Sequence, residues 1–244
     1  KDYTVMVYIV GSNLESRLGA ATTDIGEMKQ AGIDFEKTNV LVYTGGSRRW
    51  VSDIPNKYNS VLDLSTAGGS QIIAQTQESA DMGMPQTLTE FINYCVALYP
   101  AKHYGLIFWD HGGGSVSGYG YDEKYAREGS MDLSEINEAL EDGGVKFDFI
   151  GFDACLMATT ETALMLSKHA DYLIASEETE PGIGWYYTNW LTALSGNTSM
   201  PTIEIGKNII DDFVDTCGRQ CKGQPATLSV IDLAEAEHTI PQAL

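Results

Sequence analysis

Short apolar runs, of the length typical of buried strands, alternate along this chain with amphipathic segments. The runs cover residues 4–10, 39–44, 106–109, 147–152, 171–176 and 227–231. Strands that are apolar on both faces and alternate with helices predict a doubly wound α/β fold with a mainly parallel sheet. A length of 244 residues suits one domain spanning 1–244. The polar stretch after the last strand suggests that this domain is truncated at its carboxyl end.

Charge and hydropathy exclude two classes of partner. The net charge is −19, from 34 acidic and 15 basic residues, which argues against nucleic acid because a polyanion would be repelled. Basic peptides or divalent cations would be attracted. The alternative is that the acidic residues serve only to keep the protein soluble. No apolar run approaches the roughly 20 residues of a membrane span. The chain begins at Lys1 without an apolar leader, so we expect that any targeting peptide has been removed or lies outside this sequence.

Two of the apolar runs end in a reactive side chain. Residues 106–109 lead into Asp110-His111-Gly112-Gly113-Gly114, and residues 147–152 lead into Asp153-Ala154-Cys155. The carboxyl ends of parallel strands meet at one edge of a sheet, where such folds place their chemistry. We therefore expect His111 and Cys155 to face each other there.

This pairing predicts thiol chemistry at Cys155. Helical spacing over residues 156–169 places Cys155 at a strand-to-helix junction, where the helix dipole and an imidazolium would stabilise a thiolate. The N–H groups of Gly112 and Cys155 are candidates for an oxyanion hole. The alternative is a buried structural cysteine, which we assign to Cys95, and Cys217 and Cys221 fit a packing pair on one helix face.

Other hydrolase classes lack a required motif. The HGGG sequence also occurs as an oxyanion loop in esterases, but no GxSxG elbow is present here. No HExxH motif and no carboxylate cluster with ligand spacing indicates a metal site, so any metal ligands remain unknown.

Four segments together resemble the clostripain-like cysteine peptidases, relatives of caspases, legumain and gingipains. They are DHGGG, DACLMA, GSNLES after the first strand, and EPGIGW near residue 180. The resemblance implies a caspase-like α/β/α sandwich, a dyad of His111 and Cys155, an acyl-enzyme, and cleavage after arginine or lysine. It also implies self-processing of a zymogen and possible calcium dependence, with no cofactor required for the chemistry. We expect a secreted or cell-surface bacterial monomer that acts on peptides or proteins with exposed basic residues.

Asp153 supports this specificity, because it stands where the caspase QAC motif has its pocket-lining glutamine. A carboxylate there suits a basic side chain, although Asp153 capping the following helix is the alternative. The family pattern has an acidic residue soon after the GW pair, where this chain has Tyr186-Tyr187. Glu177 or Glu180 is the expected substitute.

The glycine-rich, charged stretch 115–130 is the expected site of self-cleavage. As a loop at the active edge it carries Lys124 and Arg127, and we favour Lys124 narrowly. The alternative is that Lys124 and Arg127 are two basic residues of a solvated loop and have no function. A catalytically silent peptide-binding module on the same fold is the alternative to a peptidase, and the intact His111 and Cys155 argue against it.

Overall fold

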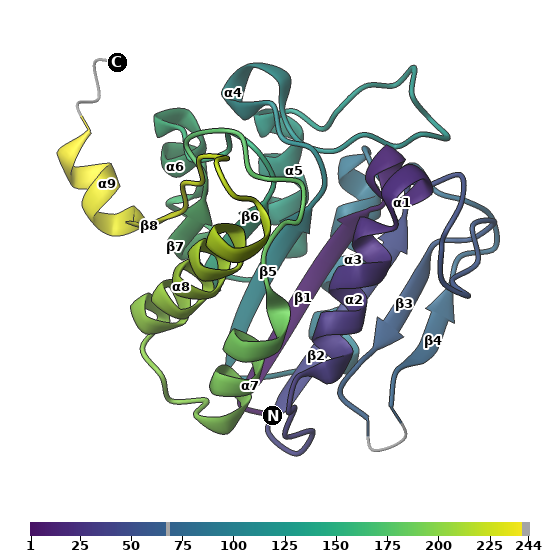
Figure 1. Ribbon diagram of the computed structural model, residues 1–244, viewed down its shortest axis with the longest axis horizontal. Coiled ribbons are helices and arrows are strands. Elements are labelled where there is room, and N and C mark those ends of the chain that lie inside the picture. Colours follow the sequence, from purple (N-terminus) through teal and green to yellow (C-terminus); the bar gives the residue numbers. More distant parts are fainter. Residues whose placement is uncertain (67–68, 241–244) are drawn as a thin grey trace.

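One eight-stranded sheet lies between two layers of helices in the computed structural model, which describes residues 1–66 and 69–240 (Figure 1). The strand order is β4-β3-β2-β1-β5-β6-β7-β8. Strands β2, β1, β5, β6 and β7 are parallel, whereas β3 pairs antiparallel with β2 and β4, and β8 with β7. The strands are β1 Tyr3–Val10, β2 Thr38–Gly45, β3 Ser60–Asp63, β4 Gln71–Gln75, β5 His103–Trp109, β6 Phe147–Asp153, β7 Ala170–Ala175 and β8 Ser229–Asp232.

The helices cover both faces of this sheet. One face carries α3, α5, α6 and α9, and the other carries α2, α7 and α8, while α1 and α4 lie at the carboxyl ends of the parallel strands (Figure 1). The helices are α1 Ser12–Leu18, α2 Ala20–Gln30, α3 Pro85–Leu98, α4 Gly114–Ser117, α5 Leu133–Gly143, α6 Thr160–Leu166, α7 Tyr187–Gly196, α8 Thr202–Gln220 and α9 Leu233–Thr239. The predicted α/β sandwich with a mainly parallel sheet is confirmed.

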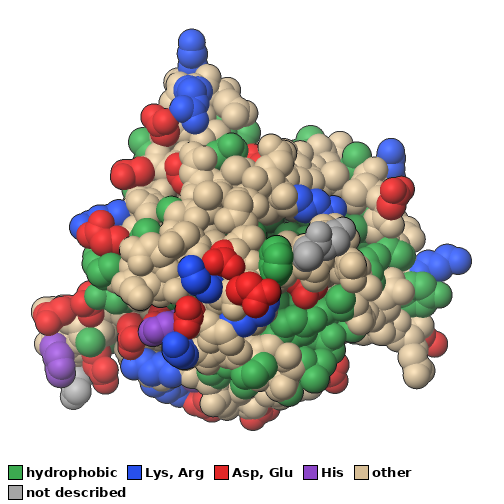
Figure 2. Space-filling view, turned by 90° about the horizontal axis from the view of Figure 1, so that it is seen from below, with side chains coloured by type: hydrophobic (Ala, Val, Ile, Leu, Met, Phe, Trp, Pro, Cys, Tyr) green, Lys and Arg blue, Asp and Glu red, His purple; other side chains and the backbone are tan. Residues whose placement is uncertain are grey.

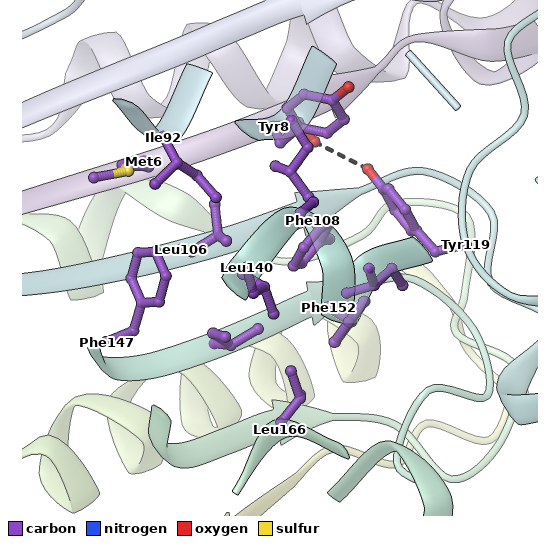
Figure 3. Close-up of a cluster of buried hydrophobic side chains, with 14 of the residues drawn as sticks. Met6, Tyr8, Ile92, Leu106, Phe108, Tyr119, Leu140, Phe147, Phe152 and Leu166 are labelled. Carbon is purple, nitrogen blue, oxygen red and sulfur yellow. Dashed lines mark hydrogen bonds between the residues drawn. The ribbon is translucent and has the colours of Figure 1, made fainter. Parts of the chain in front are cut away.

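Alternate residues of the central strands fill two separate cores. In β1, Met6 and Tyr8 face α3 and α5, whereas Val5 and Val7 face α2 and α7. All eight residues of β1 are buried, which explains the continuous apolar run in the sequence. Figure 3 shows the first of these cores.

The strand order reverses beside β1. The chain goes from β1 to β2 on one side and later returns to place β5 on the other side. Such a reversal opens a crevice at the carboxyl ends of the strands, where doubly wound proteins bind ligands. Asn13, His111 and Cys155 follow β1, β5 and β6 at this edge.

Two expectations about local structure were wrong. The helix predicted from residue 156 begins only at Thr160, because residues 154–159 form a turn after β6. Nor is the stretch 115–130 only a solvated loop. It contains α4 and the buried Tyr119, whose hydroxyl donates hydrogen bonds to the carbonyls of Tyr8 (3.0 Å) and Trp109 (3.1 Å) (Figure 3).

Candidate active site

Cys155 lies in the turn that follows β6. The next residue, Leu156, has a φ of +67°, a left-handed conformation that costs a branched side chain about 1–3 kcal/mol and persists only where the surroundings enforce it. The Cys155 Sγ accepts a hydrogen bond from the Glu180 N–H at 3.3 Å. Because α6 begins five positions later, stabilisation of the thiolate by that helix dipole is not supported.

His111 follows β5 and is oriented by Asn13. Its Nε2 lies 2.7 Å from Asn13 Oδ1. An amide oxygen only accepts, so this contact places the ring proton on Nε2 and leaves the Nδ1 lone pair available. Partial burial lowers the pKa of His111 below its ordinary value, which favours the neutral imidazole at pH 7. His111 and Cys155 line the same pocket, although no hydrogen bond joins them within the described residues.

Asp110 connects the ends of β1 and β5 beneath His111. Its Oδ1 accepts from the Ser12 hydroxyl at 2.5 Å, and its Oδ2 accepts from the Tyr121 N–H. Ser12 has a φ of +46°, an unusual conformation that holds the neighbouring Asn13 at the edge of the sheet. Burial raises the pKa of Asp110 well above its ordinary value.

Two backbone N–H groups beside the thiol are without an acceptor among the described residues. They belong to Gly112 and Cys155, the pair expected in an oxyanion hole. The backbone hydrogen bonds around Gly112 involve its neighbours and not its own N–H. The Gly113 N–H donates to the Gly118 carbonyl, and the Gly120 N–H donates to the His111 carbonyl. A side chain at position 112 would overlap the Cys155 carbonyl oxygen, so only glycine fits there.

A pocket of about 240 Å³ opens beside Cys155. Part of its wall is apolar, from residues such as Leu14 and Ile183. Four acidic residues also line it: Asp110, described above, and a group of three made up of Asp24, Asp153 and Glu180. No lysine or arginine is among the lining residues. The pocket therefore combines an apolar wall with uncompensated acidic groups.

The three carboxyl groups differ in how they are satisfied. Asp153 accepts from the Trp185 N–H (3.1 Å) and the Tyr187 hydroxyl (2.8 Å), and Asp24 accepts from Trp109 Nε1 (2.6 Å). Glu180 Oε1 is buried without a hydrogen-bond partner among the described residues.

Burial raises the pKa of all three groups, and the charge of Asp153 adds to this effect at Asp24 and Glu180. The pKa of Asp153 rises to about 7. Buried groups of this kind are stabilised by a cation that brings its own hydrogen-bond donors.

The structure brings most of the predicted site residues together. His111, Gly112, Asp153, Cys155 and Glu180 lie at one edge, whereas Glu177 is exposed, accepts from the Ser229 hydroxyl and does not line the pocket. Asp153 is not a helix cap, since the cap of α6 is Thr159.

The two residues predicted for self-cleavage differ in exposure. Lys124 is half-buried and its Nζ donates to the Asn56 carbonyl at 3.1 Å, whereas Arg127 is exposed. Arg127 is therefore the more accessible of the two, whereas the sequence analysis narrowly favoured Lys124.

Sequence reasoning missed Asn13 and Asp24. Asn13 follows a buried strand just as His111 and Cys155 do, so the same edge rule indicates it. Asp24 shares the buried face of α2 with Ala21, Ile25 and Met28. A carboxylate at helical spacing within an apolar stripe is the signal that identifies it.

Searches for a metal site and a membrane span gave no candidate within residues 1–66 and 69–240. No group of three or more His, Cys, Asp or Glu side chains has a geometry that holds a metal ion. The described helices also include none long and apolar enough to cross a bilayer.

Comparisons with known proteins agree with this geometry. Residues 7–242 match the model of the Clostripain family. Clostripain of Hathewaya histolytica is 30% identical over 258 residues, which cover 93% of this chain and 47% of that protein. The chain thus spans about half the length of this curated relative.

Two solved structures share the fold. A secreted C11 cysteine protease of Bacteroides thetaiotaomicron, in complex with an irreversible peptide inhibitor, is 26% identical with a TM-score of 0.79, covering 97% of this chain and 67% of that one. An inactive zymogen C11 protease of Parabacteroides distasonis is 24% identical with a TM-score of 0.73, covering 97% and 63%. The second shows similarity of fold only.

Proposed function

Because the chain belongs to the clostripain family, we propose that it is a cysteine endopeptidase that cleaves peptide bonds after arginine or lysine. The observation that carries this proposal is the acidic pocket beside Cys155. Its apolar wall suits the aliphatic stem of a basic side chain, and its carboxyl groups suit the charged head.

In the proposed mechanism the thiol proton of Cys155 goes to His111 Nδ1, and Sγ bonds to the substrate carbonyl carbon. The developing oxyanion accepts hydrogen bonds from the free N–H groups of Gly112 and Cys155. His111 then gives the proton to the leaving amine as the C–N bond breaks. Water, deprotonated by the same imidazole, hydrolyses the acyl-enzyme and regenerates the thiol.

Within this mechanism Asn13 is a positioning residue. Its hydrogen bond to Nε2 fixes the tautomer whose Nδ1 exchanges the proton. This is the role that a carboxylate or amide plays behind the imidazole in other dyads and triads.

Three further properties belong to the proposal. The secreted Bacteroides relative supports action outside the cell. Activation by cleavage within the stretch 115–130, which carries Lys124 and Arg127, is also part of the proposal. We also propose a monomer. Calcium dependence stays a prediction.

The direct test is covalent labelling with a peptide that ends in an arginyl acyloxymethyl ketone. We expect the intact protein to add one label at Cys155, and Cys155→Ala and His111→Ala to add none within the same time. A matched reagent with a neutral leucyl residue should label at least tenfold more slowly, because it lacks the desolvated charge pair. Losing one partner of such a pair costs about 2–5 kcal/mol of binding free energy. Reversible binding of the arginyl peptide without labelling would instead identify a silent binding module.

A further inference from the structure

A second hollow lies on the other side of His111 from the acidic pocket. Its volume is about 380 Å³, against about 240 Å³ for the acidic pocket. Its lining includes Asn13, His111, Gly113, Ser117, Tyr121 and Ser130. The proposed mechanism assigns it no role.

His111 contributes to the walls of both hollows, whereas Cys155 and the three carboxyl groups line only the first. When a basic side chain occupies the acidic pocket, the scissile carbonyl lies at Cys155. The leaving amine must then approach His111, which protonates it. The residue that follows the scissile bond therefore continues past the imidazole, away from the acidic pocket.

We propose, on the basis of the proposed peptidase function, that this second hollow is the subsite for the residue after the scissile bond, and that it selects a bulky uncharged side chain, aromatic above all. The hollow, at about 380 Å³, has room for a bulky side chain. No Lys, Arg, Asp or Glu is among its lining residues, so a charged side chain would lose water without gaining a counter-ion.

Tyr121 explains the preference for aromatic side chains. Tyr121 is 37% exposed and lines the hollow, and its ring would pack well against another aromatic side chain.

The overall charge adds discrimination against acidic residues at this position. The net charge of −19 opposes the approach of a carboxylate. The subsite therefore ranks aromatic residues first, small residues next and acidic residues last.

The test is a set of internally quenched peptides that share an arginine and differ only in the next residue, which is Tyr, Ala or Glu. We expect kcat/KM for the Tyr peptide to exceed that for the Glu peptide by about tenfold or more, within the range that one side-chain subsite supplies. Equal rates for the three peptides, or a preference for Glu, would overturn the assignment.

A filling variant tests the location of the subsite. Ser117→Phe adds a side chain to the hollow, and Val116→Phe on the same short helix is its control, since Val116 is 92% exposed and does not line the hollow. Ser117→Phe should abolish the preference for Tyr over Ala, whereas Val116→Phe should retain it. An unchanged preference in Ser117→Phe would contradict the proposed location.

A chloromethyl ketone of the same arginyl peptide has only chloride beyond the reactive carbon, so its labelling rate does not depend on the second hollow and separates the two proposals. Labelling by both variants at the parent rate shows an intact catalytic centre. A protein that labels normally but shows no preference among the peptides refutes the subsite alone. A parent protein that fails to label refutes the peptidase proposal itself.

Discussion

At the residue scale, the least expected feature is the cluster of carboxyl groups of Asp24, Asp153 and Glu180, whose pocket has no lysine or arginine among its lining residues. Asp24 and Asp153 approach each other around Gly184, where an added Cβ would lie 3.0 Å from Asp153 Oδ1 and 3.4 Å from Asp24 Oδ2. Burial raises the pKa of both groups, so their charged forms are unfavourable without a cation beside them. Under the proposed function, the pocket gains affinity for arginine at the cost of stability without substrate.

The Asp24→Asn variant separates these two effects. The amide oxygen still accepts from Trp109 Nε1, while the buried charge is lost. We expect kcat/KM on arginyl peptides to fall at least tenfold, with little change in labelling by a leucyl reagent. The control is Glu177→Gln, which removes an exposed carboxylate outside the pocket and should leave the arginine preference unchanged.

The same variant should be more stable than the parent at alkaline pH. Burial raises the folded-state pKa of Asp24 above its unfolded value, so the folded protein binds more protons, and the stability of the parent falls as pH rises through that interval. The Asp24→Asn variant has no carboxyl group to titrate at this position, so its stability does not fall for this reason. The Tm difference in favour of the variant should therefore grow between pH 5 and pH 8, and a constant difference would contradict the raised pKa.

At the element scale, the proposed catalysis depends on how closely two turns approach each other. The turn after β5 carries His111 and Gly112, and the turn after β6 carries Cys155 and Leu156. The absent side chain of Gly112 lets the first turn contact the Cys155 carbonyl, while the left-handed Leu156 bends the second turn toward it. Conformations that are costly alone persist here because both turns are anchored to adjacent buried strands.

Gly112→Ala tests this approach. The added methyl group would overlap the Cys155 carbonyl and separate the two oxyanion donors, so we expect kcat to fall by about 100-fold or more. Gly218→Ala on α8 is the control, because an added Cβ there meets nothing within 4 Å; it should retain full activity. Near-normal turnover by Gly112→Ala would exclude Gly112 from the oxyanion hole.

At the scale of the whole molecule, the two edges of the sheet differ in charge balance. Figure 2 shows the face at the amino ends of the parallel strands, where Lys and Arg side chains lie beside Asp and Glu. Examples are Lys102 with Asp2 (2.8 Å) and Lys146 with Asp171 (2.9 Å). Such exposed pairs contribute little to stability. They nevertheless offset acidic charge at this edge, whereas no lysine or arginine lines the pocket at the other edge, an asymmetry that would favour the approach of a cationic chain to the site.

Self-cleavage is the prediction that belongs to this scale. Purified active protein should consist of two fragments, the second beginning at Glu128, because Arg127 is exposed and Lys124 is held by Asn56. Cys155→Ala should remain one chain until a trace of active enzyme is added. Intact-mass measurement distinguishes the two bonds: Arg127→Ala should remain uncut and Lys124→Ala should be cut. The opposite result would restore the original preference for Lys124.

The sequence by itself determined six of the eight strands, although not β3 and β4, and the placement of His111 and Cys155. Both follow from local rules, since apolar runs form the buried strands and the ends of parallel strands meet at one edge. Only the tertiary structure decided that Glu180 rather than Glu177 lines the pocket, that Asp24 joins Asp153 there, and that Asn13 orients His111. These choices depend on distances between segments far apart in the chain, which are set by how helices and turns pack on the sheet and not by the spacing of residues along it.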